Sequence, residues 1–142
     1  MTPTEAVEIT NLFLREFGSK YTVRITDDVS YVGLCSSFHR EISISSFYLD
    51  MYDWQFSYDT IKHEIAHAIS HDRKNHGKIW QEYFLLIGGS SRNIHPYSKN
   101  VWKENRKNLV VSSEEFLDRY NKLVNDKRRE RGKQLAALKR NR

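Results

Sequence analysis

The sequence predicts a single small domain of the α+β class, in which a short β-sheet lies beside a buried helix. The chain has 142 residues, the length of one ordinary domain. Apolar residues make up 39% of it and aromatic residues 13%, which is enough for a compact core. Segments with strand-like alternation stand between segments with helical spacing. No apolar stretch reaches the ~18 residues that span a bilayer, so we expect no membrane partner.

The first expected element is a helix that begins at Pro3. Thr2 can cap this helix, Glu5 completes a capping box, and proline suits the first helical position. Gly18 is placed to end the helix. Between these ends apolar residues recur at helical spacing, namely Ala6, Ile9, Phe13 and Phe17.

Three short strands are expected next. Residues 21–26 alternate with period two, and β-like runs follow over 31–36 and 39–45. Ile42 and Ile44 share one face of the last run. The aromatic stretch over residues 47–58 is expected to be irregular or to form a short helix. Together these runs predict a small sheet.

The remaining helices are expected over about 57–70, over 78–87 and from Ser112 onward. A polar break separates the first two, and Gly88 with Gly89 ends the second. Ser112 and Glu115 form another capping box. Residues 90–111 have the composition of a loop. Past Asp126 the chain is dense in charge, and we expect a solvated helix or a frayed terminus there.

The helix expected over 57–70 contains the motif His63-Glu64-Ile65-Ala66-His67. Residues four apart lie on one helical face, about 6 Å apart along the axis, so both imidazoles can reach one ion. Glu64 projects toward the same cleft and can take a proton from a metal-bound water. The alternative is that the three polar residues lie on the surface. The neighbours of the motif argue against a surface position, because a helix that is apolar on most sides is buried. These neighbours are apolar or small, namely Ile61, Ile65, Ala66, Ala68 and Ile69.

A catalytic zinc ion takes three protein ligands and leaves one position open. His76 is the favoured third ligand, because a polar turn lets the chain double back and Gly77 allows the turn. His71 is the next candidate, but it lies about 12 Å along the helix axis from His63. His39 and His95 are weaker candidates, expected to be ordinary histidines of a loop or strand end.

The segment HEIAHAIS, followed after a short turn by HGKIWQEYFLLIGG, resembles the core of the SprT-like metallopeptidases, which include bacterial SprT and the protease domain of Spartan. The resemblance covers residues 1–92 and is most specific over 61–89. Carried over by position, it implies that His63, His67 and His76 bind Zn²⁺ and that Glu64 is the catalytic base. Gly77 and Trp80 match the family's structural glycine and aromatic positions.

The resemblance also implies a zincin fold of the minigluzincin-like type and a zinc-dependent endopeptidase that acts on a protein substrate. We expect this core over 1–92, a helical extension packed on it over 93–126, and a basic tail over 127–142. Many SprT-like proteins continue into a cysteine-based zinc ribbon. This chain has one cysteine, Cys35, and cannot form one.

The charge is unevenly distributed. Residues 121–142 carry nine Lys and Arg against two Asp and Glu, or +7, whereas residues 1–90 carry eight against twelve, or −4. The tail is therefore a candidate arm for nucleic acid, which would place the peptidase on DNA-associated proteins. A solvated terminus or a protein contact is the alternative.

Two further expectations concern function and compartment. A protein that keeps zinc only for stability, as a structural or interaction module, is the alternative to a peptidase. A single cysteine and an N-terminus without a secretory signal favour the cytoplasm (the host's, if a bacteriophage encodes the chain).

Overall fold

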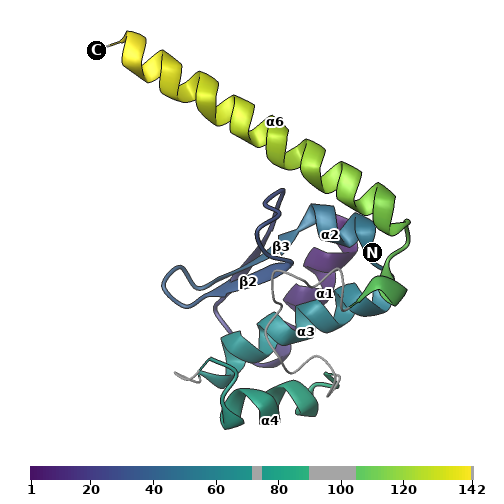
Figure 1. The fold of residues 1–142 in the computed structure, drawn as a ribbon. Helices are drawn as coiled ribbons and strands as arrows, with labels where there is room; N and C mark the ends of the chain where they lie inside the picture. The colour runs from purple at the N-terminus through teal and green to yellow at the C-terminus, as the bar shows by residue number, and fades with distance from the viewer. Residues whose placement is uncertain (72–74, 90–104, 142) are drawn as a thin grey trace. The chain divides into compact units, whose positions relative to one another are not determined.

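The computed structural model of the chain describes residues 1–71, 75–89 and 105–141. The chain divides into two compact units, Met1–Val110 and Val111–Arg142. The described part contains five α-helices and one three-stranded sheet (Figure 1). The α+β class predicted from the sequence is confirmed.

The helix α1 spans Pro3–Glu16 and begins with the predicted capping box. The Thr2 hydroxyl accepts a hydrogen bond from the Glu5 backbone N–H (3.1 Å), and the Glu5 carboxylate accepts one from the Thr2 N–H (3.2 Å). The helix ends at its C-cap, Phe17, and Gly18 follows with φ 63°. That left-handed conformation suits glycine, which has no Cβ to clash.

The sheet consists of β1 (Thr22–Thr26), β2 (Gly33–Ser36) and β3 (Glu41–Ser45), in the order β1-β3-β2. The central strand β3 pairs in parallel with β1 and antiparallel with β2. Ile42 pairs with Val23 on one side and with Cys35 on the other. Because β3 lies between two neighbours, its residues 42–45 are buried, whereas β2 lies at the edge of the sheet.

Two helices follow the sheet. The short helix α2 (Ser46–Met51) lies in the aromatic stretch, and α3 spans Trp54–Ser70. The start of α3 lies three residues earlier than the predicted residue 57, because Asp53 caps it: its carboxylate accepts a hydrogen bond from the Phe56 backbone N–H (2.8 Å). Residues 60–66 of α3 are all buried, as the apolar neighbours of the motif predict.

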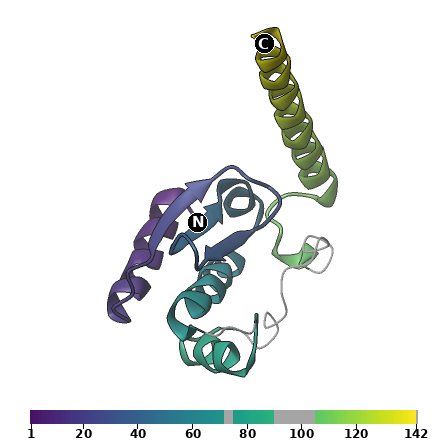
Figure 2. The same ribbon diagram turned by 90° about the vertical axis from the view of Figure 1, so that its left-hand side faces the viewer.

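The main core lies between α1, α3 and the sheet, where these elements pack together (Figures 1 and 2). Its fully buried members include Ala6 of α1, Ile42 and Ile44 of β3, and Ile61 and Ile65 of α3. A second, smaller cluster joins α3 to α4 (Lys78–Leu86), with Ala66, Trp80 and Phe84 at its centre. This packing places the start of α4 beside the HExxH motif.

A third segment, residues 105–110, packs at the N-terminal end of α3. The 3-10 helix η2 (Arg106–Asn108) lies beside the junction of α2 and α3, because the Asp53 N–H donates to the Asn108 backbone oxygen (2.8 Å). The Val110 N–H donates to the Met51 backbone oxygen (2.9 Å). Residues 105–110 therefore belong to the first unit.

The second unit consists mainly of α6 (Ser113–Arg140), whose N-cap is the predicted Ser112. The Ser112 hydroxyl accepts a hydrogen bond from the Glu115 backbone N–H (3.1 Å). The helix continues without a break through residue 127, where the basic tail was predicted to begin, and every residue from 128 to 140 is exposed. The division into extension and tail stays a prediction.

Among the described residues, the helices are all too short or too polar to cross a bilayer.

Replacing Gly89 by alanine is expected to destabilise the first unit by about 1–3 kcal/mol. A Cβ at this position would overlap the Phe84 ring, which is fully buried in the smaller cluster and cannot move away. Gly132→Ala is the control, because nothing lies within 4 Å of its Cβ position in α6. Urea unfolding followed by tryptophan fluorescence measures both. Equal stability of the two variants would contradict the packing of Phe84.

Candidate metal centre

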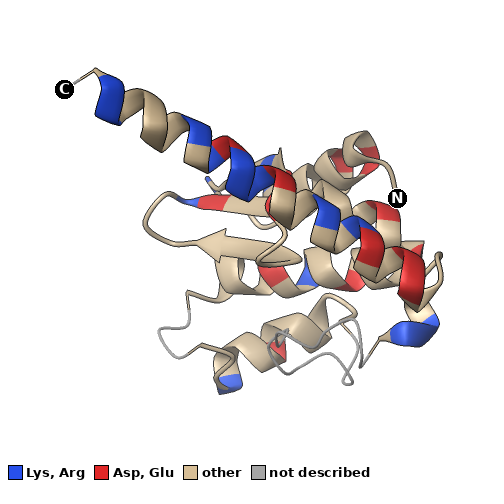
Figure 3. Cartoon of the chain, turned by 45° about the horizontal axis from the view of Figure 1, so that its top comes forward, with Lys and Arg blue, Asp and Glu red and all other residues tan. Residues whose placement is uncertain are grey.

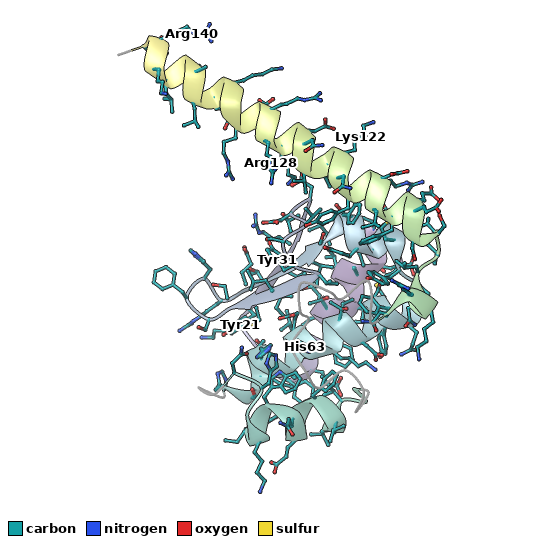
Figure 4. The ribbon with its side chains drawn as sticks, viewed as in Figure 1. Tyr21, Tyr31, His63, Lys122, Arg128 and Arg140 are labelled. Atoms are coloured by element: carbon teal, nitrogen blue, oxygen red, sulfur yellow. The ribbon has the colours of Figure 1, made fainter. Side chains whose placement is uncertain are left out.

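Three histidine side chains converge between α3 and the turn before α4. His63 and His67 project from one face of α3, and His76 comes from the turn (Figure 4 labels His63). The Nε2 atom of His76 lies 2.9 Å from Nε2 of His63 and 3.0 Å from Nε2 of His67. One ligand atom from each of the three residues lies within 4.8 Å of the other two.

A shared metal ion accounts for this geometry better than hydrogen bonding does. An imidazole nitrogen carries either one proton or one lone pair, so the Nε2 atom of His76 can form one good hydrogen bond, not two. It nevertheless lies at hydrogen-bond distance from two other ring nitrogens. Nitrogen ligands at 2.0–2.1 Å from a tetrahedral ion lie roughly 3.3 Å apart, a few tenths of an ångström more than seen here. The donor set therefore fits one ion that is bound by three imidazoles.

Trp80 holds the three imidazoles together. Its ring centroid lies 4.7 Å from that of His63, 5.2 Å from that of His67 and 4.6 Å from that of His76. The indole N–H also donates a hydrogen bond to the His63 backbone oxygen (3.2 Å), and Trp80 is fully buried. This packing explains why the sequence has a large aromatic residue one helical turn after His76.

The backbone conformation of the turn directs the His76 side chain toward α3. His76 has φ 56°, a left-handed conformation that is costly for a residue with a Cβ. Gly77 follows in an extended conformation as the N-cap of α4. The Gln81 side-chain amide donates a hydrogen bond to the His76 backbone oxygen (3.0 Å), which holds the turn against the first turn of α4.

Glu64 lies between α3 and the edge strand β2. Its residue is 4% exposed, and the backbone N–H of Cys35 donates a hydrogen bond to its carboxylate. Burial raises the pKa of the Glu64 carboxyl to about 8, and the hydrogen bond from Cys35 opposes that rise. A buried carboxyl whose pKa lies near neutrality can both accept and release a proton in the working range of pH.

The close approach of β2 to α3 depends on Gly33. A Cβ there would lie 3.0 Å from Cγ of Glu64 and 3.1 Å from Cγ2 of Thr60. The sequence interpretation missed this contact, although an isolated glycine in a strand is a known sign of close approach. It also missed the N–H of Cys35 as a partner of Glu64, for which the sequence contains no signal. Burial raises the pKa of the Cys35 thiol to about 12, so the thiol stays protonated.

The other candidate histidines lie elsewhere. His71 is the C-cap of α3, with φ 52°, and is not part of the histidine group. His39 is exposed in the turn between β2 and β3, where its ring contacts that of Phe38. His95 lies outside the described residues. The structure thus brings together the three favoured histidines and leaves His71 and His39 apart from them.

A buried ion pair on α3 contacts the segment that follows the C-terminus of α4. The Lys62 ammonium lies 3.2 Å from the Asp59 carboxylate and donates a hydrogen bond to the Gly88 backbone oxygen (2.6 Å). The two side chains are 5% and 8% exposed, so water screens the pair little. In the sequence, this pair looks like an ordinary surface pair of a helix.

In a comparison with models of protein families, the model of the SprT-like family matches residues 6–100, about two thirds of the chain. No curated protein and no solved structure matches the chain.

Proposed function

The chain belongs to the SprT-like family, a family linked to metallopeptidases with a zincin-like fold, and on this premise we propose that it is a zinc-dependent peptidase. The resemblance noted in the sequence is confirmed. The observation that carries the proposal is the convergence of three imidazole nitrogens beside a buried carboxyl group on the same helix.

Zinc suits the donor set because imidazole nitrogen is one of its preferred ligands and three protein ligands leave a fourth position open. His63, His67 and His76 would hold the ion. When bound, zinc lowers the pKa of a coordinated water and polarises a carbonyl group. The packing of Trp80 against all three rings keeps the nitrogens in place before an ion arrives.

Glu64 is proposed as the general base. Its carboxylate would accept a proton from the attacking water and then release that proton to the nitrogen of the broken peptide bond. The hydrogen bond from Cys35 and the close approach of the Gly33 backbone restrict where the carboxylate can lie. Among the described residues, the candidate metal-binding group consists of the three histidines alone, so Glu64 is not placed as a metal ligand.

The edge strand β2 is proposed to bind the substrate. A backbone N–H has one proton to donate, and that of Cys35 is directed to Glu64, so it faces away from β3. The outer edge of β2 therefore borders the base, and only the other edge pairs with β3. An extended peptide that adds to this edge would pass beside Glu64.

The proposal is tested with an unfolded protein such as casein as the substrate. The zinc-loaded chain is expected to cleave it, a chelator is expected to stop the cleavage, and added zinc is expected to restore it. A chain that holds one zinc ion and cleaves no member of a panel of unfolded proteins would favour the alternative, a protein in which zinc serves only stability or interaction.

His76→Ala is expected to weaken zinc binding by more than about 100-fold. Removing a residue that only hydrogen-bonds to a metal ligand costs roughly 10–100-fold, and removing a ligand itself should cost more. The reason is that the Nε2 atom of His76 lies 2.9 Å from Nε2 of His63 and 3.0 Å from Nε2 of His67, so all three rings can reach one ion. His71→Ala is the matched control and is expected to change the affinity only a few-fold, since His71 lies outside the group. Competition with a chromophoric chelator measures both affinities. The reverse ranking would mean that the turn before α4 is misassigned.

A second proposal is that α6 binds nucleic acid. Residues 127–140 carry seven Lys and Arg against one Glu, and those from 128 onward are exposed (Figures 3 and 4). Figure 4 labels three of the basic residues of this helix, Lys122, Arg128 and Arg140. At 100° per residue, the seven basic side chains spread over about two thirds of the helix circumference, which suits contact with phosphates and not the reading of a base sequence.

Deleting residues 127–142 is expected to remove DNA binding while zinc content and hydrolysis stay nearly unchanged. Binding of the full chain should fall by about 10³-fold between 50 and 200 mM salt, because counterions are released from the phosphates. Leu135 and Leu138 are 54% and 65% exposed, so the deletion removes little buried surface. Fluorescence anisotropy with two unrelated DNA sequences measures the affinity. A full chain that does not bind DNA at 50 mM salt would contradict this role.

A further inference from the structure

A cavity of about 590 Å³ opens in the first unit. It lies where residues 17–21, the turn between β2 and β3, the end of α3 and the middle of α4 meet. Neither Glu64 nor any of the three grouped histidines lines it. A proposal for this cavity therefore does not rest on the proposed function.

The described lining of the cavity is rich in cations. Lys20, Arg40 and His71 contribute nitrogen donors, and none of the described lining residues is acidic. This is unusual for its surroundings, because residues 1–90 as a whole carry a charge of −4. Two cations that line one cavity on an acidic part of the chain, with no carboxylate among the described lining residues, favour binding of an anion.

The backbone brings these side chains together from three segments. The Thr22 N–H donates a hydrogen bond to the Arg40 backbone oxygen (3.0 Å), which ties the turn to the segment that carries Lys20. Arg40 has φ 49° and His71 has φ 52°, left-handed conformations that are costly for residues with a Cβ. Such conformations cluster at binding sites, where the surrounding fold holds them.

Hydroxyl groups and an apolar floor complete the cavity. Tyr21 and Tyr83 line it, and burial, opposed by the charge of Arg40, raises the pKa of Tyr21, so its hydroxyl stays a donor at neutral pH (Figure 4 labels Tyr21). The floor is made by Ala68 and Ile69, which are 1% and 8% exposed. The lining thus offers donors for a charged group and an apolar surface for the rest of a ligand.

We propose that this cavity binds a small organic anion, whose carboxylate or phosphate group contacts Lys20 and Arg40 and whose apolar part lies on Ala68 and Ile69. Charge-assisted hydrogen bonds to the anionic group supply the affinity. The simpler alternative is that the two cations only neutralise the backbone carbonyls at the ends of α1 and α3.

The test is a titration of the full, zinc-loaded chain, followed through its backbone amide signals by NMR. The probes are N-acetylleucine, which has a carboxylate beside an apolar side chain, inorganic phosphate, and N-acetylleucinamide as the uncharged control. Saturable shifts are expected at residues 18–21 and 68–71 with at least one of the two anions and not with the amide. The anion that binds more tightly identifies the group that the cavity prefers.

Lys20→Gln combined with Arg40→Asn is expected to weaken this binding by about tenfold or more, since each substitution removes a charged donor. Asparagine is chosen because it tolerates the left-handed conformation of residue 40. Lys78→Gln combined with Lys107→Gln removes the same charge at two exposed residues that do not line the cavity, and it should leave the affinity unchanged. If the double variant does not fold, Lys20→Gln alone replaces it, because Lys20 is exposed.

Two results would overturn the proposal. The first is the absence of saturable shifts at the cavity with either anion; if the cavity variant is then also less stable, the cations serve the helix ends. The second is equal binding by the wild type and by the cavity variant.

Discussion

Glu64→Gln is expected to lower the rate of peptide hydrolysis by about 10²–10⁴-fold while one zinc ion stays bound. Glutamine has the shape of glutamate and can keep the hydrogen bond from Cys35 through its carbonyl oxygen, but it cannot accept a proton from water. Hydrolysis of a fluorogenic peptide and metal analysis of the same samples measure the two quantities.

Glu82→Gln is the matched control, because Glu82 is an exposed glutamate of α4 and is not part of the histidine group. It should retain full activity. Near-normal hydrolysis by Glu64→Gln would exclude this residue as the base. Loss of zinc from Glu64→Gln would instead mean that the carboxylate supports the metal site.

His63→Ala combined with His67→Ala is expected to lower the zinc content from about one ion per chain to background, because one remaining imidazole cannot hold the ion. Hydrolysis should disappear with it. His39→Ala combined with His71→Ala removes two histidines that lie outside the group and should leave the zinc content unchanged. Metal analysis after dialysis measures both. Stoichiometric zinc in the first variant would refute the site.

The features that sequence reasoning predicted correctly are those set by neighbours in the chain. The capping boxes at Thr2 and Ser112 depend on residues three apart, and the structure contains the hydrogen bond from the third residue to each cap. The spacing of His63 and His67 follows from helical periodicity alone. Such local relations survive folding because they do not depend on tertiary packing.

The sequence separates His76 from His71 less clearly, because both follow the motif closely. In the structure both residues have a left-handed backbone conformation. His71 ends α3, whereas the turn at His76 directs the His76 ring back toward α3. The start of α3 was placed three residues late, because the aromatic residues around Asp53 conceal its role as the N-cap.

The contacts that complete the site join segments distant in the chain. The N–H of Cys35 and the close approach of Gly33 bring β2 to Glu64, about 30 residues later. Lys62, which is paired with Asp59, also donates a hydrogen bond to the backbone oxygen of Gly88. Every residue has a backbone oxygen, so the sequence does not indicate this contact. Contacts of this kind depend on the register of the sheet and on helix packing, and a single sequence does not encode them as a pattern.

The most direct test of the central claim is X-ray absorption at the zinc edge of the wild-type protein, which counts the imidazoles bound to the ion. The account predicts one zinc ion with three imidazole ligands. It predicts a ligand of another kind at the fourth position, which is the position proposed for hydrolysis. A zinc ion bound by fewer than three imidazoles, or a protein that binds no zinc, would contradict it.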